Sequence, residues 1–111
     1  MALYIPRKGD FIVVSFTPQS GHEQKGRRPA LVVSNDLFNK HTRLAIACPI
    51  TNTDRKIPFH ICVPDTSTLS GFVMVEQIKS IDYVARKAKL VEKAPQDFLN
   101  EVLAILDACL Y

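Results

Sequence analysis

The sequence lacks the patterns by which metal-binding proteins are usually recognised. It contains no C-x-x-C pair, no H-x-x-x-H pair and no cluster of aspartates, so neither a structural zinc nor a two-metal nuclease site has visible ligands. Cysteine is scarce, because only Cys48, Cys62 and Cys109 are present and each lies within an apolar run. We expect all three to be reduced core residues, and we expect the protein to need no metal or other cofactor.

Long hydrophobic segments are also missing. The amino terminus has no apolar stretch of the kind found in signal peptides, and no run approaches membrane-spanning length. The cytoplasm is therefore the expected location. Repeats and low-complexity segments are absent, and a chain of 111 residues is large enough for one core but not for two. Residues 1–111 are predicted to form a single domain.

The positive charge of the chain is unevenly distributed. The formal net charge is +3, but residues 1–60 carry nine Lys and Arg against four Asp and Glu, whereas residues 61–111 carry five against seven. The first half is therefore electropositive. This asymmetry makes a polyanion such as a nucleic acid a plausible partner.

Short β-branched and aromatic runs separated by turn residues dominate the sequence and predict strands. One helical turn is expected over Asp36–Asn39, with Ser34 or Asn35 as its cap. His60 alternates with apolar neighbours and is interpreted as a structural strand histidine. The five or six predicted strands are Phe11–Phe16, Ala30–Ser34, Leu44–Ile50, Phe59–Val63, Phe72–Val75 and the stretch around Tyr83–Leu90.

The last segment has helical periodicity. From Pro95 onward, apolar residues recur at i, i+3, i+4, i+7 and i+11, which predicts an amphipathic helix with proline at its first turn. One face should cover the sheet, and the apolar excess could serve a subunit contact. Many short strands closed by one helix predict a small, strongly bent sheet or barrel. The helical stripe consists of Leu99, Val102, Leu103, Leu106 and Leu110, and Phe98, Ile105 and Cys109 widen it.

A loop bounded by glycine and proline, residues 21–29, holds Glu23 and Arg28 between two predicted strands. A carboxylate can move protons, whereas a guanidinium stays charged and only donates hydrogen bonds. The pair therefore suits phosphoryl chemistry, with Glu23 as proton carrier and Arg28 as anion clamp.

Four ordered motifs carry a resemblance that covers nearly the whole chain. They are the Pro-x-x-Gly-Asp of Pro6–Asp10, the Glu-Gln-x-Gly-x-Arg-Pro of Glu23–Pro29, the Pro-Ile-Thr of Pro49–Thr51 and the Glu-Gln-Ile-Lys-Ser-Ile of Glu76–Ile81. With these motifs the chain resembles the MazF/PemK/Kid family of toxin endoribonucleases from type II toxin–antitoxin pairs. The resemblance implies a mainly β fold: an SH3-like small barrel of five to seven strands with a C-terminal amphipathic α-helix, paired as a homodimer.

The resemblance also implies a function. The family cuts single-stranded RNA, including mRNA, at short sequences without a metal, inhibits translation and growth, and is neutralised by a cognate antitoxin with an acidic, partly disordered tail. By this resemblance, the expected catalytic residues in this chain are Glu23, Arg28 and Thr51. Metal-free cleavage uses the neighbouring 2′-OH as nucleophile and leaves a 2′,3′-cyclic phosphate and a 5′-OH.

The general acid stays open. A guanidinium such as that of Arg28 gives up a proton only reluctantly, whereas a histidine such as His22 is the better donor near neutral pH. Some relatives place an arginine two residues before the acidic position that Glu76 matches, and this chain has Met74 there. A mechanism that needs this second arginine does not transfer directly.

Polar and basic residues near the ends of the predicted strands are expected to contact RNA. They could follow the phosphates or hydrogen-bond to unpaired base edges, and tryptophan is absent as a stacking platform. The predicted RNA-binding residues are His22, Gln24, Lys25, Arg27, Asn52, Arg55, Lys56, Glu76, Gln77 and Lys79.

Two alternatives remain from the sequence. A CcdB-like toxin that poisons DNA gyrase has the same fold class, but such toxins rely on a tryptophan near the carboxyl end, which this chain lacks. A non-catalytic RNA-binding barrel would bind RNA without cutting it.

Overall fold

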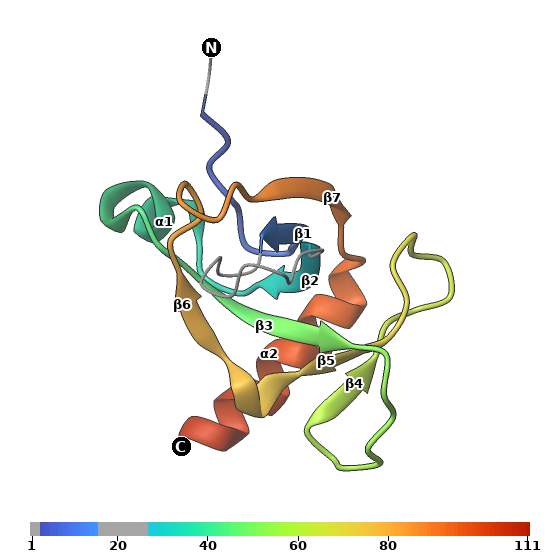
Figure 1. Ribbon diagram of the computed structural model, residues 1–111. Coiled ribbons are helices and arrows are strands. Elements are labelled where there is room, and N and C mark those ends of the chain that lie inside the picture. The colour runs from blue at the N-terminus through green and yellow to red at the C-terminus, as the bar shows by residue number, and fades with distance from the viewer. Residues whose placement is uncertain (1–2, 16–26) are drawn as a thin grey trace.

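The computed structural model describes residues 3–15 and 27–111, which form a bent antiparallel sheet with two α-helices (Figure 1). A single 3₁₀ turn, η1, precedes the sixth strand. The helices are α1 (Asp36–Thr42) and α2 (Gln96–Leu110), and η1 covers Val75–Gln77. The strands are β1 (Asp10–Ser15), β2 (Arg27–Val32), β3 (Ala45–Thr51), β4 (His60–Cys62), β5 (Phe72–Met74), β6 (Lys79–Ile81) and β7 (Lys89–Lys93).

The central strand of the sheet is β3. It pairs with β2 along one edge, and along the other edge it pairs first with β6 and then with β5. The full order is β4-β5-β3-β2-β1-β7, with β6 beside β3. No pairing joins β4 to β7 within the described ranges, so the sheet is barrel-like but not closed. The predicted class, a small and mainly β fold with a C-terminal helix, is confirmed.

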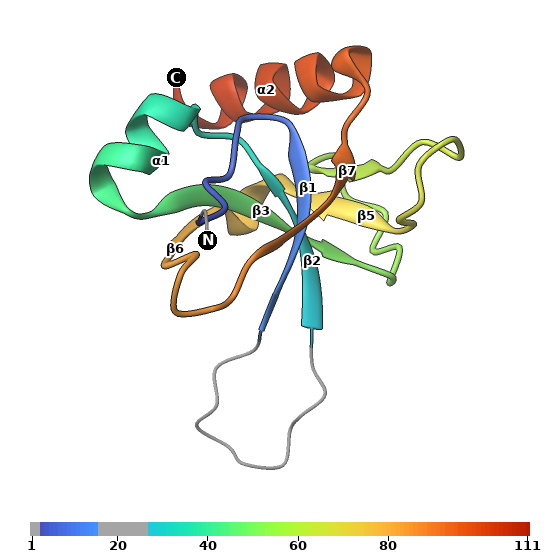
Figure 2. The ribbon, with the colours of Figure 1, turned by 90° about the horizontal axis from the view of Figure 1, so that it is seen from above.

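Each face of the sheet carries its own apolar core. Side chains alternate across β1, so Phe11 packs in one cluster and Ile12 in the other, and both are fully buried. The Phe11 cluster lies under α2, where the ring centroids of Phe11 and Phe98 are 6.0 Å apart. Figure 2 shows α2 lying across this face. The opposite face carries the second cluster, which includes Ala30 and Ala47 and contains no residue of α2.

The C-terminal helix follows the predicted pattern along its first half. It begins directly after Pro95 and buries Leu99 and Val102 against the sheet. Leu110 is 65% exposed, so the predicted stripe does not reach the sheet along its whole length. A subunit contact by this exposed end stays a prediction. Neither helix in the described residues is long and apolar enough to span a lipid bilayer.

The first helix is longer than the single turn predicted. Asn35 caps it, because the side-chain oxygen accepts a hydrogen bond from the Phe38 N–H at 2.9 Å. The helix then runs to Thr42, and Arg43 ends it in the left-handed conformation at φ 63°. The cap prediction was correct for Asn35, but the length was underestimated because no strong breaker follows Asn39.

The strand predicted around Tyr83–Leu90 was wrong for most of its length. In the structure, residues 82–88 connect β6 and β7 through a turn, and only Lys89 and Leu90 of that stretch belong to a strand, β7. The aromatic ring of Tyr83 is buried within this turn, and its hydroxyl donates a hydrogen bond to the Asn39 carbonyl at 2.7 Å. β6 and most of β7 were missed because both strands are short and carry exposed lysines, so they lack a hydrophobic run.

Candidate active site

A pocket of about 280 Å³ opens on the face of the sheet opposite α2. It lies over the small residues Ala30 and Ala47, which leave room because they carry only a methyl group. Residues from β1, β2, β3, β5, η1 and β6 and from two loops surround it. The lining consists of Val14, Arg28, Pro29, Ala30, Ala47, Pro49, Ile50, Thr51, Arg55, Met74, Gln77, Lys79, Ile81 and Arg86.

The strand register explains why Arg28 and Thr51 meet at this pocket. Ala30 of β2 pairs with Pro49 of β3. Continuing the same antiparallel register by two residues brings Arg28 level with Thr51. Both residues lie an even number of positions from these partners, so they share one face of the sheet. Two of the three predicted catalytic residues are therefore side by side, and both line the pocket.

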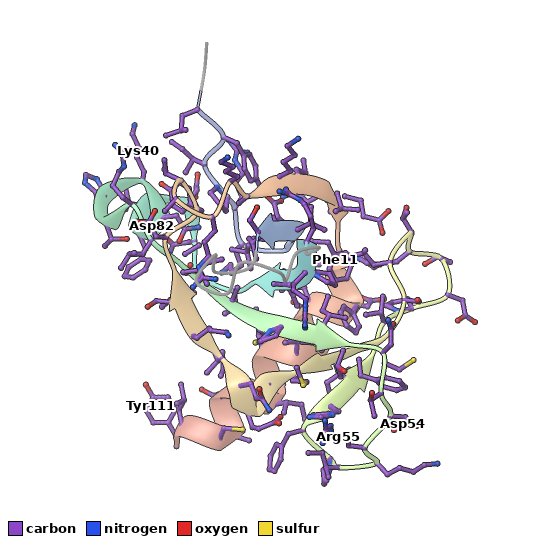
Figure 3. The ribbon with its side chains drawn as sticks, in the orientation of Figure 1. Phe11, Lys40, Asp54, Arg55, Asp82 and Tyr111 are labelled. Atoms are coloured by element: carbon purple, nitrogen blue, oxygen red, sulfur yellow. The ribbon has the colours of Figure 1, made fainter. Side chains whose placement is uncertain are left out.

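The pocket is strongly cationic. Its lining contains Arg28, Arg55, Lys79 and Arg86 and, among the described residues, no carboxylate. Lys79 pairs with Ala47 across the β3 and β6 strands, and Arg55 comes from the loop between β3 and β4 (Figure 3). Cations gathered in one concave site raise the local concentration of anions and hold phosphates.

A second pocket of about 440 Å³ adjoins the first and shares Arg28, Pro29, Ile50 and Thr51 with it. It lies toward the loop between β4 and β5. Its remaining lining residues are Arg27, Asn52, Thr68, Leu69 and Ser70. Arg28 and Thr51 therefore stand at the junction of two connected sites.

Seven of the residues predicted as catalytic or RNA-binding line one or both pockets. Thr51 sits where β3 ends, and its side-chain oxygen accepts a hydrogen bond from the Thr53 N–H at 3.2 Å. Arg27 lines only the second pocket, and its guanidinium donates to Ser15 Oγ at 3.1 Å and to the Lys87 carbonyl at 3.0 Å. The seven are Arg27, Arg28, Thr51, Asn52, Arg55, Gln77 and Lys79.

Glu76 and Lys56 line neither pocket. Glu76 Oε2 lies 2.9 Å from His60 Nε2 and also accepts a longer bond from Gln77 Nε2 at 3.4 Å. Desolvation acts to raise the pKa of Glu76, but the hydrogen bonds, above all that from His60, outweigh it and lower the pKa below its usual value. The His60 side chain is only 1% exposed, which agrees with its interpretation as a structural histidine.

The predicted residues His22, Glu23, Gln24 and Lys25 lie outside the described residues. Their roles stay predictions. Arg27 and Arg28, the first two residues of β2, both line the second pocket, and Arg28 also lines the first.

Sequence reasoning missed Arg86, which lines the cationic pocket. It was hidden in the stretch wrongly predicted as a strand. In the structure the Arg86 carbonyl accepts a hydrogen bond from the Ser15 N–H at 2.8 Å, which fixes this turn against the end of β1. Met74, at the position where some relatives of the resembled family carry arginine, lines the same pocket. Its thioether cannot clamp a phosphate.

The core placement predicted for the cysteines is correct for Cys48 but wrong for Cys62 and Cys109. Cys48 is buried, and burial above all raises the pKa of its thiol to about 12, so it stays protonated. Cys62 and Cys109 are exposed, because each lies on the outer side of an element whose other side packs inward. No group of three or more His, Cys, Asp or Glu side chains in the described parts of the chain could hold a metal ion.

The fold and the pocket together define a small, mainly β protein with a cationic pocket on one face of its sheet. Comparison with known proteins assigns this small β protein to one family. Residues 7–110 match the family described as PemK-like, MazF-like toxin of type II toxin-antitoxin system. The chain belongs to this family. The match covers nearly the whole chain, as the four motifs predicted.

Individual relatives agree with this assignment. The chain is 36% identical to the Escherichia coli endoribonuclease PemK over 107 residues, which cover 93% of this chain and 80% of that protein. It is also 36% identical to the endoribonuclease toxin MazF of Escherichia coli K12, over 77% of this chain and 76% of that protein. A MazE–MazF structure from Deinococcus radiodurans matches with a TM-score of 0.89 and 41% identity, over 96% of each chain. The predicted family and enzyme class, endoribonuclease, are confirmed.

Proposed function

We propose that this protein is a toxin that cuts single-stranded RNA at short sequences, without a metal, through attack by the ribose 2′-OH. The observation that carries the proposal is the junction of the two pockets, where Arg28 and Thr51 lie among cationic side chains. Such a site can hold a phosphodiester and stabilise the added charge as the phosphorane forms.

The catalytic residues divide the work of this scheme. Glu23 removes the proton from the 2′-OH, whose oxygen then forms a bond to phosphorus. The Arg28 fork donates to two nonbridging oxygens, and the Thr51 hydroxyl donates to the same phosphate. The bond to the 5′ oxygen breaks, and that oxygen takes a proton from His22 or, through the phosphorane, from Arg28. The products are a 2′,3′-cyclic phosphate and a 5′-OH.

The proposal can be tested with purified protein and a long unstructured transcript in excess EDTA. We expect discrete fragments with cyclic phosphate at one end and 5′-hydroxyl at the other, because no step needs a divalent ion. Binding without cutting would instead identify an RNA-binding barrel. Intact RNA together with inhibition of DNA gyrase would identify a CcdB-like toxin.

Phosphate contacts by the cationic pocket predict a salt dependence. Four cations line it, and each contact with a single strand contributes roughly −0.7 to the slope of log affinity against log salt. We expect a slope of roughly −3, measured by fluorescence anisotropy with a 2′-deoxy oligonucleotide that cannot be cut. Arg86→Gln should reduce its magnitude by about 0.7. A slope near zero would contradict phosphate binding by this pocket.

Two partners belong to the proposal. The solved MazE–MazF complexes from Deinococcus radiodurans support a cognate antitoxin for this chain as well. An acidic, partly disordered antitoxin tail would compete with RNA for the cationic pocket. A homodimer is expected, since pairing would lengthen the RNA groove of so small a domain. The cytoplasm remains the expected location, where mRNA is found and translation is inhibited.

A further inference from the structure

The second pocket differs chemically from the cationic one. Beyond the shared junction it adds Asn52, Thr68 and Ser70, which are neutral hydrogen-bonding residues, together with the apolar Leu69. The other residue that it adds is Arg27, whose guanidinium donates hydrogen bonds to Ser15 and to the Lys87 carbonyl. Apolar walls with a few neutral donors and acceptors suit an unpaired base, whereas cations suit phosphates. A base seated here would be next to the phosphate held at Arg28 and Thr51.

The outer wall of this pocket is a loop, residues 63–71, whose base is fixed. The Val63 N–H donates to the Gly71 carbonyl at 2.9 Å, which closes the loop between β4 and β5. Gly71 adopts φ 125°, and a Cβ at this position would lie 2.5 Å from the Thr51 carbonyl oxygen. Glycine is required there, because it allows the end of the loop to lie directly against the end of β3. The loop that forms this wall therefore lies directly against β3, the strand that carries Thr51.

The middle of the same loop is held by a strand far away in the sequence. Both oxygens of Glu92, on β7, accept from Thr68: Oε2 from the Thr68 N–H at 2.9 Å and Oε1 from the Thr68 hydroxyl at 2.7 Å. These two hydrogen bonds lower the pKa of Glu92, so the carboxylate stays ionised near neutral pH. The Thr68 hydroxyl hydrogen is thereby committed to Glu92. Its oxygen can then only accept from a ligand.

We propose that this second pocket binds one unpaired base beside the cleaved phosphate, and that Glu92 is the positioning residue that sets its sequence preference. The inference rests on the endoribonuclease function proposed above. Glu92 holds Thr68 in place with its oxygen restricted to accepting. The site therefore favours a base that presents an N–H or an exocyclic amino group to Thr68.

The test maps cleavage positions of the full-length protein on a transcript of known sequence and reads the base preference around the cut. Glu92→Gln replaces one accepting oxygen by a donor, and Thr68→Val removes the hydroxyl at constant shape. Both variants should lose preference at one position by roughly tenfold, the effect of about one hydrogen bond. On the preferred oligonucleotide, KM should rise while kcat changes less than about threefold. Thr68→Ser, which keeps the hydroxyl, should restore the preference.

Glu101→Gln on the exposed side of α2 is the matched control, because it makes the same chemical change away from both pockets. It should leave the cleavage map unchanged. A Thr68→Val protein that is folded and keeps the wild-type preference at every position overturns the assignment, whatever the behaviour of Glu92→Gln. A uniform loss of kcat with unchanged preference overturns it too. A wild-type protein that cuts no RNA overturns the proposed function and this inference together.

Discussion

Arg28→Ala should slow RNA cleavage by roughly 100- to 1000-fold, because it removes the donor fork at the junction of the two pockets. Arg28→Lys should recover only part of the rate, since one ammonium cannot bridge two phosphate oxygens as a guanidinium does. Glu23→Gln should slow RNA cleavage by roughly 100- to 10,000-fold, because the amide cannot take the 2′-OH proton. Single-turnover rates on an RNA oligonucleotide measure all three effects on the chemical step.

Two matched variants separate these effects from a general loss of charge. Arg7→Ala removes an exposed arginine that lines neither pocket, and Glu101→Gln removes an exposed carboxylate from α2. Both should cut RNA at the wild-type rate. If Arg28→Ala remained within about threefold of the wild type, the phosphate-clamp role of Arg28 would be wrong. The same outcome for Glu23→Gln would move the general base to another residue.

The core strands could be predicted from the sequence because they are buried on both faces. The runs at β1 and β3 and in the second half of β2 are mostly apolar, because side chains on one face pack in the cluster under α2 and those on the other face pack in the second cluster. The strands β6 and β7 could not be predicted in this way. They lie at edges, carry exposed lysines and depend on pairing with strands far away in the sequence. Aromatic residues such as Tyr83 are typical of strands, and a strand was therefore predicted where most residues form a turn.

The same difference applies to the candidate site, where residues in local motifs could be predicted and residues placed by tertiary contacts could not. Arg28, Thr51 and Lys79 could be predicted because each lies in one of the four ordered sequence motifs. Arg86 reaches the cationic pocket only through the turn after β6, and Thr68 and Ser70 reach the second pocket through a loop held by Glu92. These contacts depend on tertiary structure, and no local pattern in the sequence indicates them.

A buried carboxylate fixes the amino-terminal segment to the sheet and governs the largest expected change in stability. Asp10, 2% exposed, accepts hydrogen bonds from the Tyr4 hydroxyl and from the Arg7 N–H at 3.0 Å, and Lys93 Nζ lies 2.8 Å from its other oxygen. Burial, followed by the hydrogen bond to Asp10, raises the pKa of Tyr4, so its hydroxyl remains a donor. The side chain of Asp10, on β1, therefore contacts two other segments, the amino-terminal one and β7.

Asp10→Ala should lower the free energy of unfolding by roughly 2–4 kcal/mol, because it leaves the Tyr4 hydroxyl and the Arg7 N–H without their acceptor. This corresponds to a fall in Tm of roughly 10 °C or more. Urea unfolding followed by circular dichroism measures the free energy directly. The site chemistry should be unaffected below the new Tm, since Asp10 lines neither pocket.

Lys93 allows the charge to be separated from the hydrogen bonds. Its side chain is 58% exposed, so solvent already screens the ion pair with Asp10. Lys93→Gln should therefore cost less than about 1 kcal/mol, and Lys89→Gln, an exposed control on the same strand, should cost almost nothing. A loss for Lys93→Gln as large as that for Asp10→Ala would contradict this order. The stabilising interaction would then be the charge pair rather than the buried acceptor, and the amino-terminal segment would depend on Lys93.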